Sequence, residues 1–244
     1  TRYWRDWSSD VCSSDLGSIL FDSTLDSDAV AARDLTVTSG QGNIRFNNLV
    51  GETDKLDVVT INQARNVTVD AGMTVNTFDQ PNATAGTGTF TLGLGGPELL
   101  TAETGTVTIS SNVVDLEGSI RTFGQDVVIN GGAAGGAIDL NADQSITTTA
   151  VPGQGGVDAS VASGAIDINA INTGTVEIAG DLITTGATNA NNDGSDGGVA
   201  IPLIGLGSDQ VPVVLRRRTA HSQSVSQSMV VLAVVVVGAG AVAR

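Results

Sequence analysis

Short stretches of alternating hydrophobic and polar residues recur along most of the chain, separated by Gly, Asn and Asp. In each stretch Val, Ile, Leu or Phe alternates with polar residues, as expected for strands with one buried and one exposed face. No apolar set with helical spacing is sustained over several turns. The pattern predicts an all-β fold with strands in the ranges 18–23, 34–39, 43–48, 57–62, 66–71, 73–78, 88–94, 105–110, 125–131, 136–142, 164–170 and 174–180.

Several of these stretches recur as phrases. ARDLTVTSG begins at residue 32 and is echoed by ARNVTVDAG from residue 64. GGAIDLNADQSITTT begins at residue 135 and is echoed by SGAIDINAINTGTVEI from residue 163. SIRTFG, SITTTA and DLITTG form a third recurring phrase. Repetition at a period near 30 residues, built only of strands, is typical of a solenoid or a propeller.

Side-chain content separates these two architectures. Propeller blades usually carry aromatic signatures, whereas aromatic residues make up 3% of this chain. Small β-branched side chains suit the narrow interior of a parallel β-helix, and Asn and Thr can form ladders at its corners. We therefore predict a parallel β-helix (β-solenoid) of roughly six to nine coils over residues 17–201. The same model predicts interior or cap packing for the Phe residues at 21, 46, 78, 90 and 123.

The repeated phrases resemble those of a known group of proteins. ARDLTVTSGQGNIRFNNLVG, ARNVTVDAG, GAIDLNADQSITTT and DLITTGATNANNDGSDGGVAI are similar in style to the large repetitive β-helical exoproteins of bacteria. These include filamentous-haemagglutinin-like adhesins, autotransporter passengers and "beta strand repeat" surface proteins. The resemblance covers residues 17–201 and rests on low-complexity motifs rather than on a unique signature.

The resemblance implies a non-catalytic structural or adhesive segment, located extracellularly or on the outer surface of the cell. The implied partner is a glycan or a protein on a host or neighbouring cell. The secretion domain and membrane anchor of such proteins are not recognisable in this sequence. We therefore expect an internal fragment that meets a membrane only through other parts of its parent protein.

Both ends of the chain differ in amino-acid composition from residues 17–201. Residues 1–16 are predicted to be a non-native leader, because DWSSDVCSSDL (6–16) matches the translation of a sequencing-library adapter at every position. Trp4, Trp7 and Cys12 accordingly receive no functional weight. Residues 202–244 form an atypical tail that ends in an apolar run, 229–243. Three interpretations of this tail stay open: a membrane segment shorter than the roughly 17–25 residues of a spanning helix, a natural β-segment, or an out-of-frame translation.

Charge narrows the range of partners. The chain has 26 acidic residues against 11 Lys and Arg, for a net charge of −15. Nucleic acids are bound through Lys and Arg, so this balance argues against DNA or RNA as a partner. A single cysteine supplies neither a disulfide nor a thiolate metal site. The single histidine, His221, lies among Ser and Gln in the tail and is interpreted as a solvated side chain.

One loop is a candidate metal site. NNDGSDGG (191–198) offers hard oxygen ligands from Asp193, Ser195 and Asp196, and its glycines let backbone carbonyls turn inward, as calcium prefers. Neither the EF-hand pattern nor the calcium-binding nonapeptide repeat is complete here. The alternative is a solvated corner loop without an ion.

Carboxylates on the predicted strands form a second candidate. Asp139, Asp143 and Asp167 would either stack along one face and gather divalent ions, or point outward and prevent edge pairing. No catalytic residue and no cofactor other than calcium is predicted. Two alternative functions stay open: a polysaccharide-active β-helix enzyme, which needs paired carboxylates, and a calcium-stabilised extracellular module.

Overall fold

The structure of the chain is a computed structural model that describes residues 10–13, 17–81, 88–93, 99–131, 136–150, 163–171, 175–184, 199–200, 203–204 and 213–215. In these ranges the chain is all-β. The strands are β1 (Asp10–Ser13), β2 (Ile19–Phe21), β3 (Leu35–Thr38), β4 (Asn43–Phe46), β5 (Leu56–Gln63), β6 (Asn66–Val69), β7 (Met73–Gln80), β8 (Thr89–Leu92), β9 (Leu99–Ala102), β10 (Val107–Ser111), β11 (Val113–Leu116), β12 (Ser119–Thr122), β13 (Val127–Gly131), β14 (Ala137–Leu140), β15 (Ser145–Thr147), β16 (Ile166–Ile171), β17 (Thr175–Ile178), β18 (Asp181–Ile183), β19 (Val199–Ala200), β20 (Leu203–Ile204) and β21 (Val213–Leu215). The described ranges contain no helix long and apolar enough to cross a membrane.

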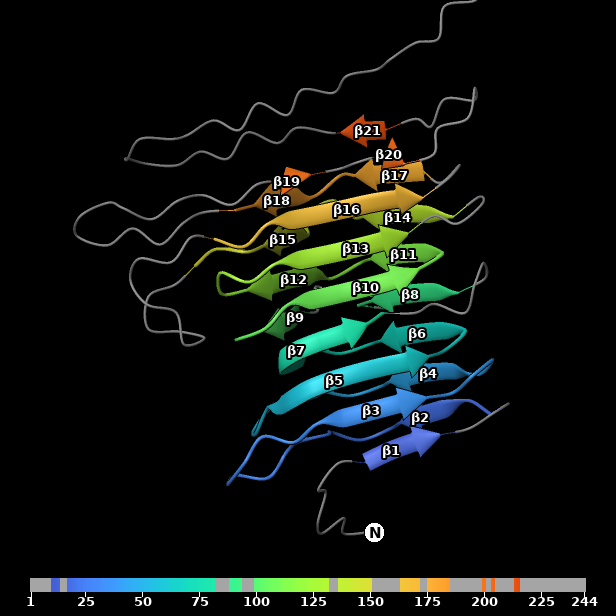
Figure 1. Ribbon diagram of the computed structural model, residues 1–244, viewed down its shortest axis with the longest axis vertical. Coiled ribbons are helices and arrows are strands. Elements are labelled where there is room, and N and C mark those ends of the chain that lie inside the picture. The colour runs from blue at the N-terminus through green and yellow to red at the C-terminus, as the bar shows by residue number, and fades with distance from the viewer. Residues whose placement is uncertain are drawn as a thin grey trace, which may run out of the picture.

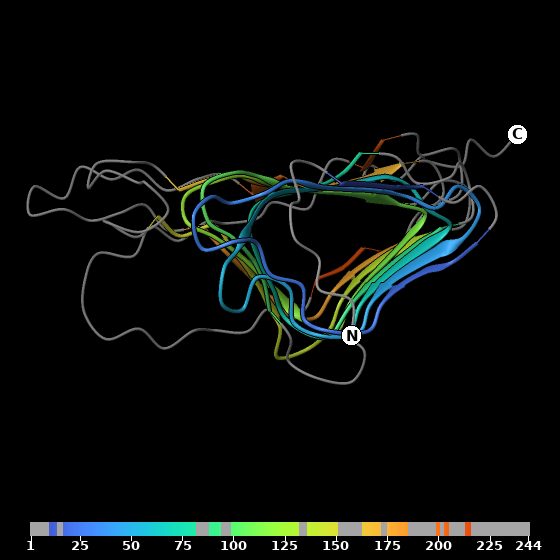
Figure 2. The same ribbon diagram turned by 90° about the horizontal axis from the view of Figure 1, so that it is seen from below.

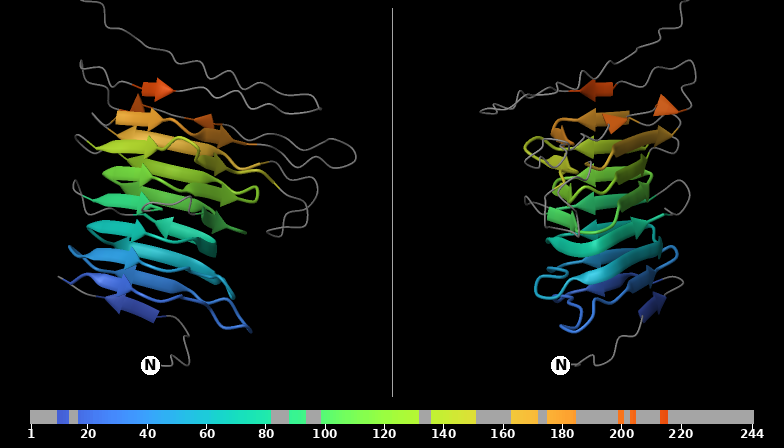
Figure 3. Two further views of the ribbon diagram at one scale, coloured as in Figure 1. Left: turned by 180° about the vertical axis from the view of Figure 1, so that it is seen from behind. Right: turned by 60° about the vertical axis from the view of Figure 1, so that its left-hand side comes forward.

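The strands form two sheets whose strands all pair in parallel. Sheet B has 8 strands in the order β2-β4-β6-β8-β11-β14-β17-β21. Sheet A has 13 strands. Along the chain, single strands of the two sheets alternate up to β8, and beyond it two or three consecutive strands of sheet A separate those of sheet B. The chain therefore rises level by level, and each strand lies over one from an earlier passage (Figures 1 and 3).

Sheet A divides at β7 into two branches. The start of β7, from Met73, pairs with β9, whereas its end, from Phe78, pairs with β10. One branch continues through β12, β15 and β18, and the other through β13, β16 and β19. Viewed along the long axis, strands of successive levels superimpose and outline a common section (Figure 2).

The core consists of apolar rows that run from strand to strand. Because successive side chains of a strand point to opposite faces, in-register parallel pairing places every inward residue over another inward residue. Two such rows cross sheet B, and each of their residues from β4 to β17 is at most 3% exposed. They are Ile44, Val67, Phe90, Val114, Ile138 and Val176, and Phe46, Val69, Leu92, Leu116, Leu140 and Ile178.

The phenylalanines pack as the sequence predicts. Phe46, Phe78 and Phe90 have no exposed surface. The Phe21 ring stacks on Phe46 with centroids 4.7 Å apart and planes 3° from parallel. Phe123 is 8% exposed, and the guanidinium of Arg121 lies 4.8 Å from its ring centroid. The interior packing expected for Phe46, Phe78 and Phe90 is confirmed.

Buried hydroxyl groups satisfy the backbone at the corners. Ser39, Thr122 and Thr148 are fully buried. The Ser39 and Thr122 hydroxyls donate to carbonyl oxygens three residues later, on Gly42 at 2.9 Å and on Gln125 at 2.5 Å. The Thr148 hydroxyl donates to the carbonyl oxygen of Gly164, 16 residues later in sequence, at 2.6 Å. Since an unpaired buried carbonyl is costly, these short polar side chains are what permits sharp corners beside an apolar core.

The structure confirms the all-β prediction for the described residues, and each of the twelve predicted ranges overlaps a strand. The phrase SIRTFG/SITTTA/DLITTG corresponds to β12, β15 and β18, where Ile120, Ile146 and Leu182 lie in register. The phrase that begins at residues 32 and 64 behaves differently, because Leu35 belongs to sheet A and Val67 to sheet B. Similar phrases thus indicate similar strands, but these strands do not occupy equivalent positions in the fold.

The ends of the chain also contribute strands. Within the adapter-like leader, β1 pairs with β3, and within residues 202–244, β20 and β21 pair with β16 and β17. The division of the chain into residues 1–16, 17–201 and 202–244 stays a prediction. His221 and the apolar run 229–243 lie outside the described residues.

Candidate functional site

One row of side chains that alternates with the inward rows of sheet B contains three consecutive carboxylates. It includes Leu20 in β2 and Arg45 in β4, and it passes through threonines in β6 and β8. It then reaches Asp115 in β11, Asp139 in β14 and Glu177 in β17, which we call the acidic row. Neighbouring strands lie about 4.8 Å apart, so like charges stand directly opposite one another, an arrangement that destabilises a sheet.

The surroundings of the acidic row disfavour its charged form. Partial burial raises the pKa of Asp115, and the negative charges of Glu117 and Asp139 raise it further. Burial also raises the pKa of Asp139, followed by the charge of Glu177. Within the described ranges, no group of three or more His, Cys, Asp or Glu residues is arranged to hold a metal ion. The acidic row is therefore a strip of like charge rather than a chelating cluster.

Asparagine side chains form ladders between levels. The Asn66 amide nitrogen donates to Asn43 Oδ1 at 2.9 Å, and Asn66 Oδ1 accepts from the backbone N–H of Thr89 at 3.1 Å. On sheet A, Asn169 Nδ2 donates to Asn130 Oδ1 at 2.9 Å. These contacts join residues 23 and 39 positions apart in sequence. The ladders add side-chain hydrogen bonds parallel to those of the backbone.

Two ion pairs also tie levels together. Arg45 Nε lies 2.5 Å from Asp70 Oδ2, and Lys55 Nζ pairs with Glu103 Oε2 across 48 residues of sequence. Lys55 is the only lysine of the chain. Both pairs are partly exposed, so each adds modestly to stability. Their main consequence is geometric, since each joins segments that come close only through the stacking of strands.

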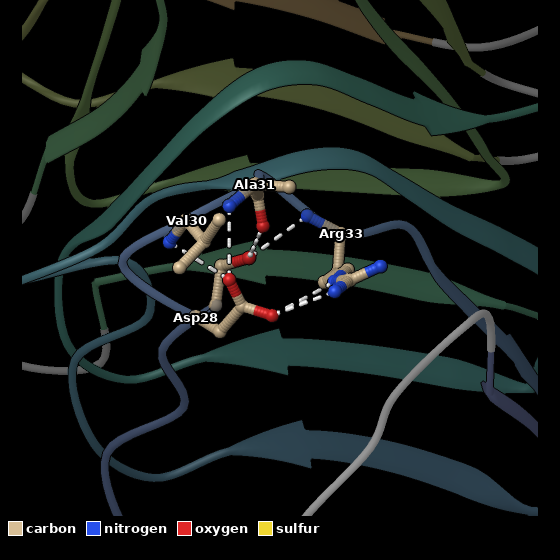
Figure 4. Close-up of polar contacts among 5 residues, drawn as sticks. Asp28, Val30, Ala31 and Arg33 are labelled. Atoms are coloured by element: carbon tan, nitrogen blue, oxygen red, sulfur yellow. Dashed lines mark hydrogen bonds and ion pairs between the residues drawn. The ribbon is translucent and has the colours of Figure 1, made fainter.

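The loop before β3 is held by a clasp of polar contacts (Figure 4). Asp28 Oδ1 accepts from the backbone N–H of Val30 at 2.8 Å and of Ala31 at 2.9 Å. Its Oδ2 accepts from Arg33 Nη2 at 2.7 Å and from Nε at 3.1 Å. The Arg33 hydrogen bond, followed by the two backbone contacts, lowers the pKa of Asp28 to about 2. These contacts of Asp28 fix the conformation of the loop before β3, in which the Val30 side chain is 93% exposed.

Of the predicted site residues, the structure describes only the strand and corner carboxylates, Asp139, Asp143 and Asp167. Asp193, Ser195 and Asp196 lie outside the described residues, so the calcium site stays a prediction. The hypothesis that Asp139, Asp143 and Asp167 share one face is wrong. Asp139 lies on β14 of sheet B and Asp167 on β16 of sheet A, while Asp143 occupies a corner with a positive φ of 69°.

Asp115 and Glu177 are partners of Asp139 that the sequence pattern does not predict. A signal for them exists, because VVDL, AIDL and TVEI share an acid that is followed by an inward apolar residue. IDI within β16 has the same pattern yet belongs to sheet A, so the pattern alone does not select the right set. Only the pairing of the strands defines the acidic row.

Comparison with family models, with curated proteins and with solved structures finds no match to this chain.

Proposed function

We propose that the chain winds as a parallel β-helix and serves as a rigid, non-catalytic structural segment. One observation supports this most strongly. Parallel pairing continues from β2 to β21 in sheet B, and two inward rows stay apolar from β4 to β17. At about 4.8 Å per level, the eight strands of sheet B span about 34 Å.

The rigidity of such a segment comes from hydrogen bonds that run along its long axis. In such a winding, the backbone hydrogen bonds run along the long axis, and the asparagine ladders and ion pairs run the same way. Bending the rod would break several of these contacts at once, whereas the loops at its corners can vary without disturbing the core. This combination suits a stalk or spacer.

In keeping with the sequence resemblance, we propose a segment of a large repetitive bacterial exoprotein of the adhesin type, located extracellularly or on the outer cell surface. Its partner is a glycan or a protein of a host or neighbouring cell. The excess of acidic residues supports a partner other than nucleic acid. Contact with a membrane falls to other parts of the parent protein.

Cysteine pairs test the winding. In a background with Cys12→Ser, Thr68→Cys/Thr91→Cys and Thr36→Cys/Thr60→Cys place thiols on neighbouring strands in register. At about 4.8 Å between Cα atoms, both pairs lie within the range that a disulfide spans. Both are expected to oxidise rapidly, as followed by mass spectrometry of the unreduced protein.

Thr36→Cys/Thr68→Cys is the matched control. These residues occupy the same place in the phrase that recurs at residues 32 and 64, yet they lie on different sheets. No rapid disulfide is expected for this pair. Its formation in preference to the other two would overturn the proposed winding.

Deletion of one whole level tests the structural role. Removing residues 90–113 joins Thr89 directly to Val114, which belongs to the same inward row as Phe90. The shortened chain is expected to keep its β circular dichroism and a cooperative melt, because Val114 then lies over Val67. Removing residues 90–101, about half a level, is expected to abolish folding. Equal tolerance of both deletions would contradict a level-by-level structural segment.

A polysaccharide-active enzyme is the second candidate, and the acidic row favours it. Asp115 and Asp139 stand at a separation of about 5 Å, similar to that of the two carboxyls of a retaining glycosidase. Incubation with a panel of acidic and neutral polysaccharides tests this function. The stalk predicts no release of reducing ends, whereas release that Asp139→Asn abolishes would establish the enzyme.

A further inference from the structure

β3, near one end of sheet A, has an unusual neighbour. β3 pairs with β5 on one side and with the four-residue strand β1 on the other. The register places Asp10 opposite Leu35 and Cys12 opposite Val37. Leu35 and Val37 are inward residues, 2% and 0% exposed. β1 thus supplies backbone pairing at this edge with little apolar content.

The same two rows are apolar across most of the remainder of sheet A. The row of Leu35 continues through Val59, Phe78, Val107, Val127 and Ile166, all without exposed surface. Val37 is in register with Ile61, which is equally buried. On the later strands Ile109, Ile129 and Ile168 form a buried apolar row, which is in register with the buried Gln80 of β7. The β1 residues in register with Leu35 and Val37 are Asp10 and Cys12, so neither register position of β1 holds a β-branched apolar residue.

We propose that the edge of β3 is a strand-acceptor site whose preferred occupant is an extended peptide with apolar, β-branched residues at two alternate positions. This peptide docks in parallel, with those residues in register with Leu35 and Val37. β1 is a weak occupant that such a peptide displaces. Main-chain hydrogen bonds supply part of the affinity, and the two inward residues supply the selectivity, as in other cases of strand addition.

The chemistry of the occupant follows from the rows that it continues. The peptide TGTVTISS, residues 104–111, carries Val107 from the row of Leu35. Two positions later it carries the buried Ile109, with the same spacing as Val37 has from Leu35. The peptide is a suitable probe, because the protein itself packs these two side chains in its core. TGTDTDSS, with both apolar residues replaced by Asp, keeps the backbone and is the matched control. The site requires only the pairing of β1, β3 and β5, so it stands or falls independently of the proposed structural role.

Three forms of the full chain are compared by fluorescence anisotropy with labelled peptides. Val11→Pro/Cys12→Pro removes two consecutive backbone donors of β1 and so frees the edge. Asp10→Val/Cys12→Val gives β1 the apolar residues that it lacks. We expect TGTVTISS to bind the proline variant about tenfold more tightly than the unmodified chain, because β1 no longer competes. The valine variant is expected to bind no peptide and to melt at a higher temperature than the unmodified chain.

Several results would overturn the proposal. These are absence of saturable TGTVTISS binding to the proline variant, equal binding of TGTVTISS and TGTDTDSS, or equal affinity of all three proteins. A proline variant that dimerises, by light scattering after size exclusion, and ignores the peptide would replace the peptide with a second copy of the chain. Circular dichroism of each variant verifies that its sheets are intact.

Discussion

Replacing the middle carboxylate of the acidic row is expected to stabilise the protein. Asp139 stands between Asp115 and Glu177 in register, so Asp139→Asn removes two like-charge contacts at once. The amide has nearly the same shape as the carboxylate. Because the amide is neutral, it also avoids the cost of partly burying a charge, which is the effect that raises the pKa of Asp139. Both effects act in the same direction.

The magnitude follows from Coulomb's law. Two unit charges about 4.8 Å apart in a medium of water-like dielectric repel by about 0.9 kcal/mol. Screening at physiological ionic strength, with a Debye length of about 8 Å, halves this value. Two contacts then amount to about 1 kcal/mol at 0.15 M salt and about 1.5 kcal/mol at 0.01 M. Asp139→Asn should raise the free energy of unfolding by these amounts.

The assay is urea unfolding followed by circular dichroism at pH 7 and at both salt concentrations. The unmodified protein should gain stability as salt is added, and Asp139→Asn should gain less. Asp167→Asn is the control, because the register neighbours of Asp167 are Val128 and Ala200, which carry no charge. It should leave the salt dependence unchanged.

The pH dependence provides a second check of sign. Since the pKa values of Asp115 and Asp139 are raised in the folded protein, their ionisation opposes folding. Stability from these groups should increase as pH falls through their raised values towards 3.8, and Asp139→Asn should weaken this rise. Asp28 acts oppositely, because its pKa is lowered to about 2, and its contribution is lost between pH 3.8 and about 2. An Asp139→Asn variant that is less stable than the unmodified protein, with an unchanged salt dependence, would refute this reasoning.

Three further predictions concern the core, the surface and the calcium loop. Phe90→Ala should lower the free energy of unfolding by about 3–5 kcal/mol. The ring is fully buried, and the strands on either side cannot move together to fill the cavity that its removal leaves. A carbodiimide should link Lys55 to Glu103, giving one dominant cross-linked peptide by mass spectrometry. The calcium hypothesis predicts that EDTA lowers the melting temperature and that Asp193→Asn/Asp196→Asn removes this shift.

Each of these predictions has a control. Thr91→Ala changes the outward neighbour of Phe90 and should stay within about 0.5 kcal/mol of the unmodified protein, so an equal loss from both would contradict the core assignment. Glu103→Gln should eliminate the cross-link, and a persistent link would assign it to another carboxylate. A melt that EDTA leaves unchanged would reject the calcium site and leave the solvated corner loop.

Much of the local structure is determined by the sequence. Alternation of apolar and polar residues specifies which segments are strands, and it also separates inward residues such as Ile44 and Phe46 from outward ones such as Arg45. The burial of the phenylalanines follows from the same alternation, because apolar side chains on the inward face have only the core to pack in. Parallel pairing agrees with the prediction as well.

Only the tertiary structure decides which strands are neighbours. A strand's own residues define its two faces, but its register depends on the length of the corners and on the partner it meets across the core. This is why Leu35 and Val67, alike in their phrases, lie in different sheets, and why Asp139 stands beside Asp115 and Glu177 rather than Asp167. The acidic row, the asparagine ladders and the edge of β3 are properties of that pairing, since each joins residues that only the stacking of levels brings together.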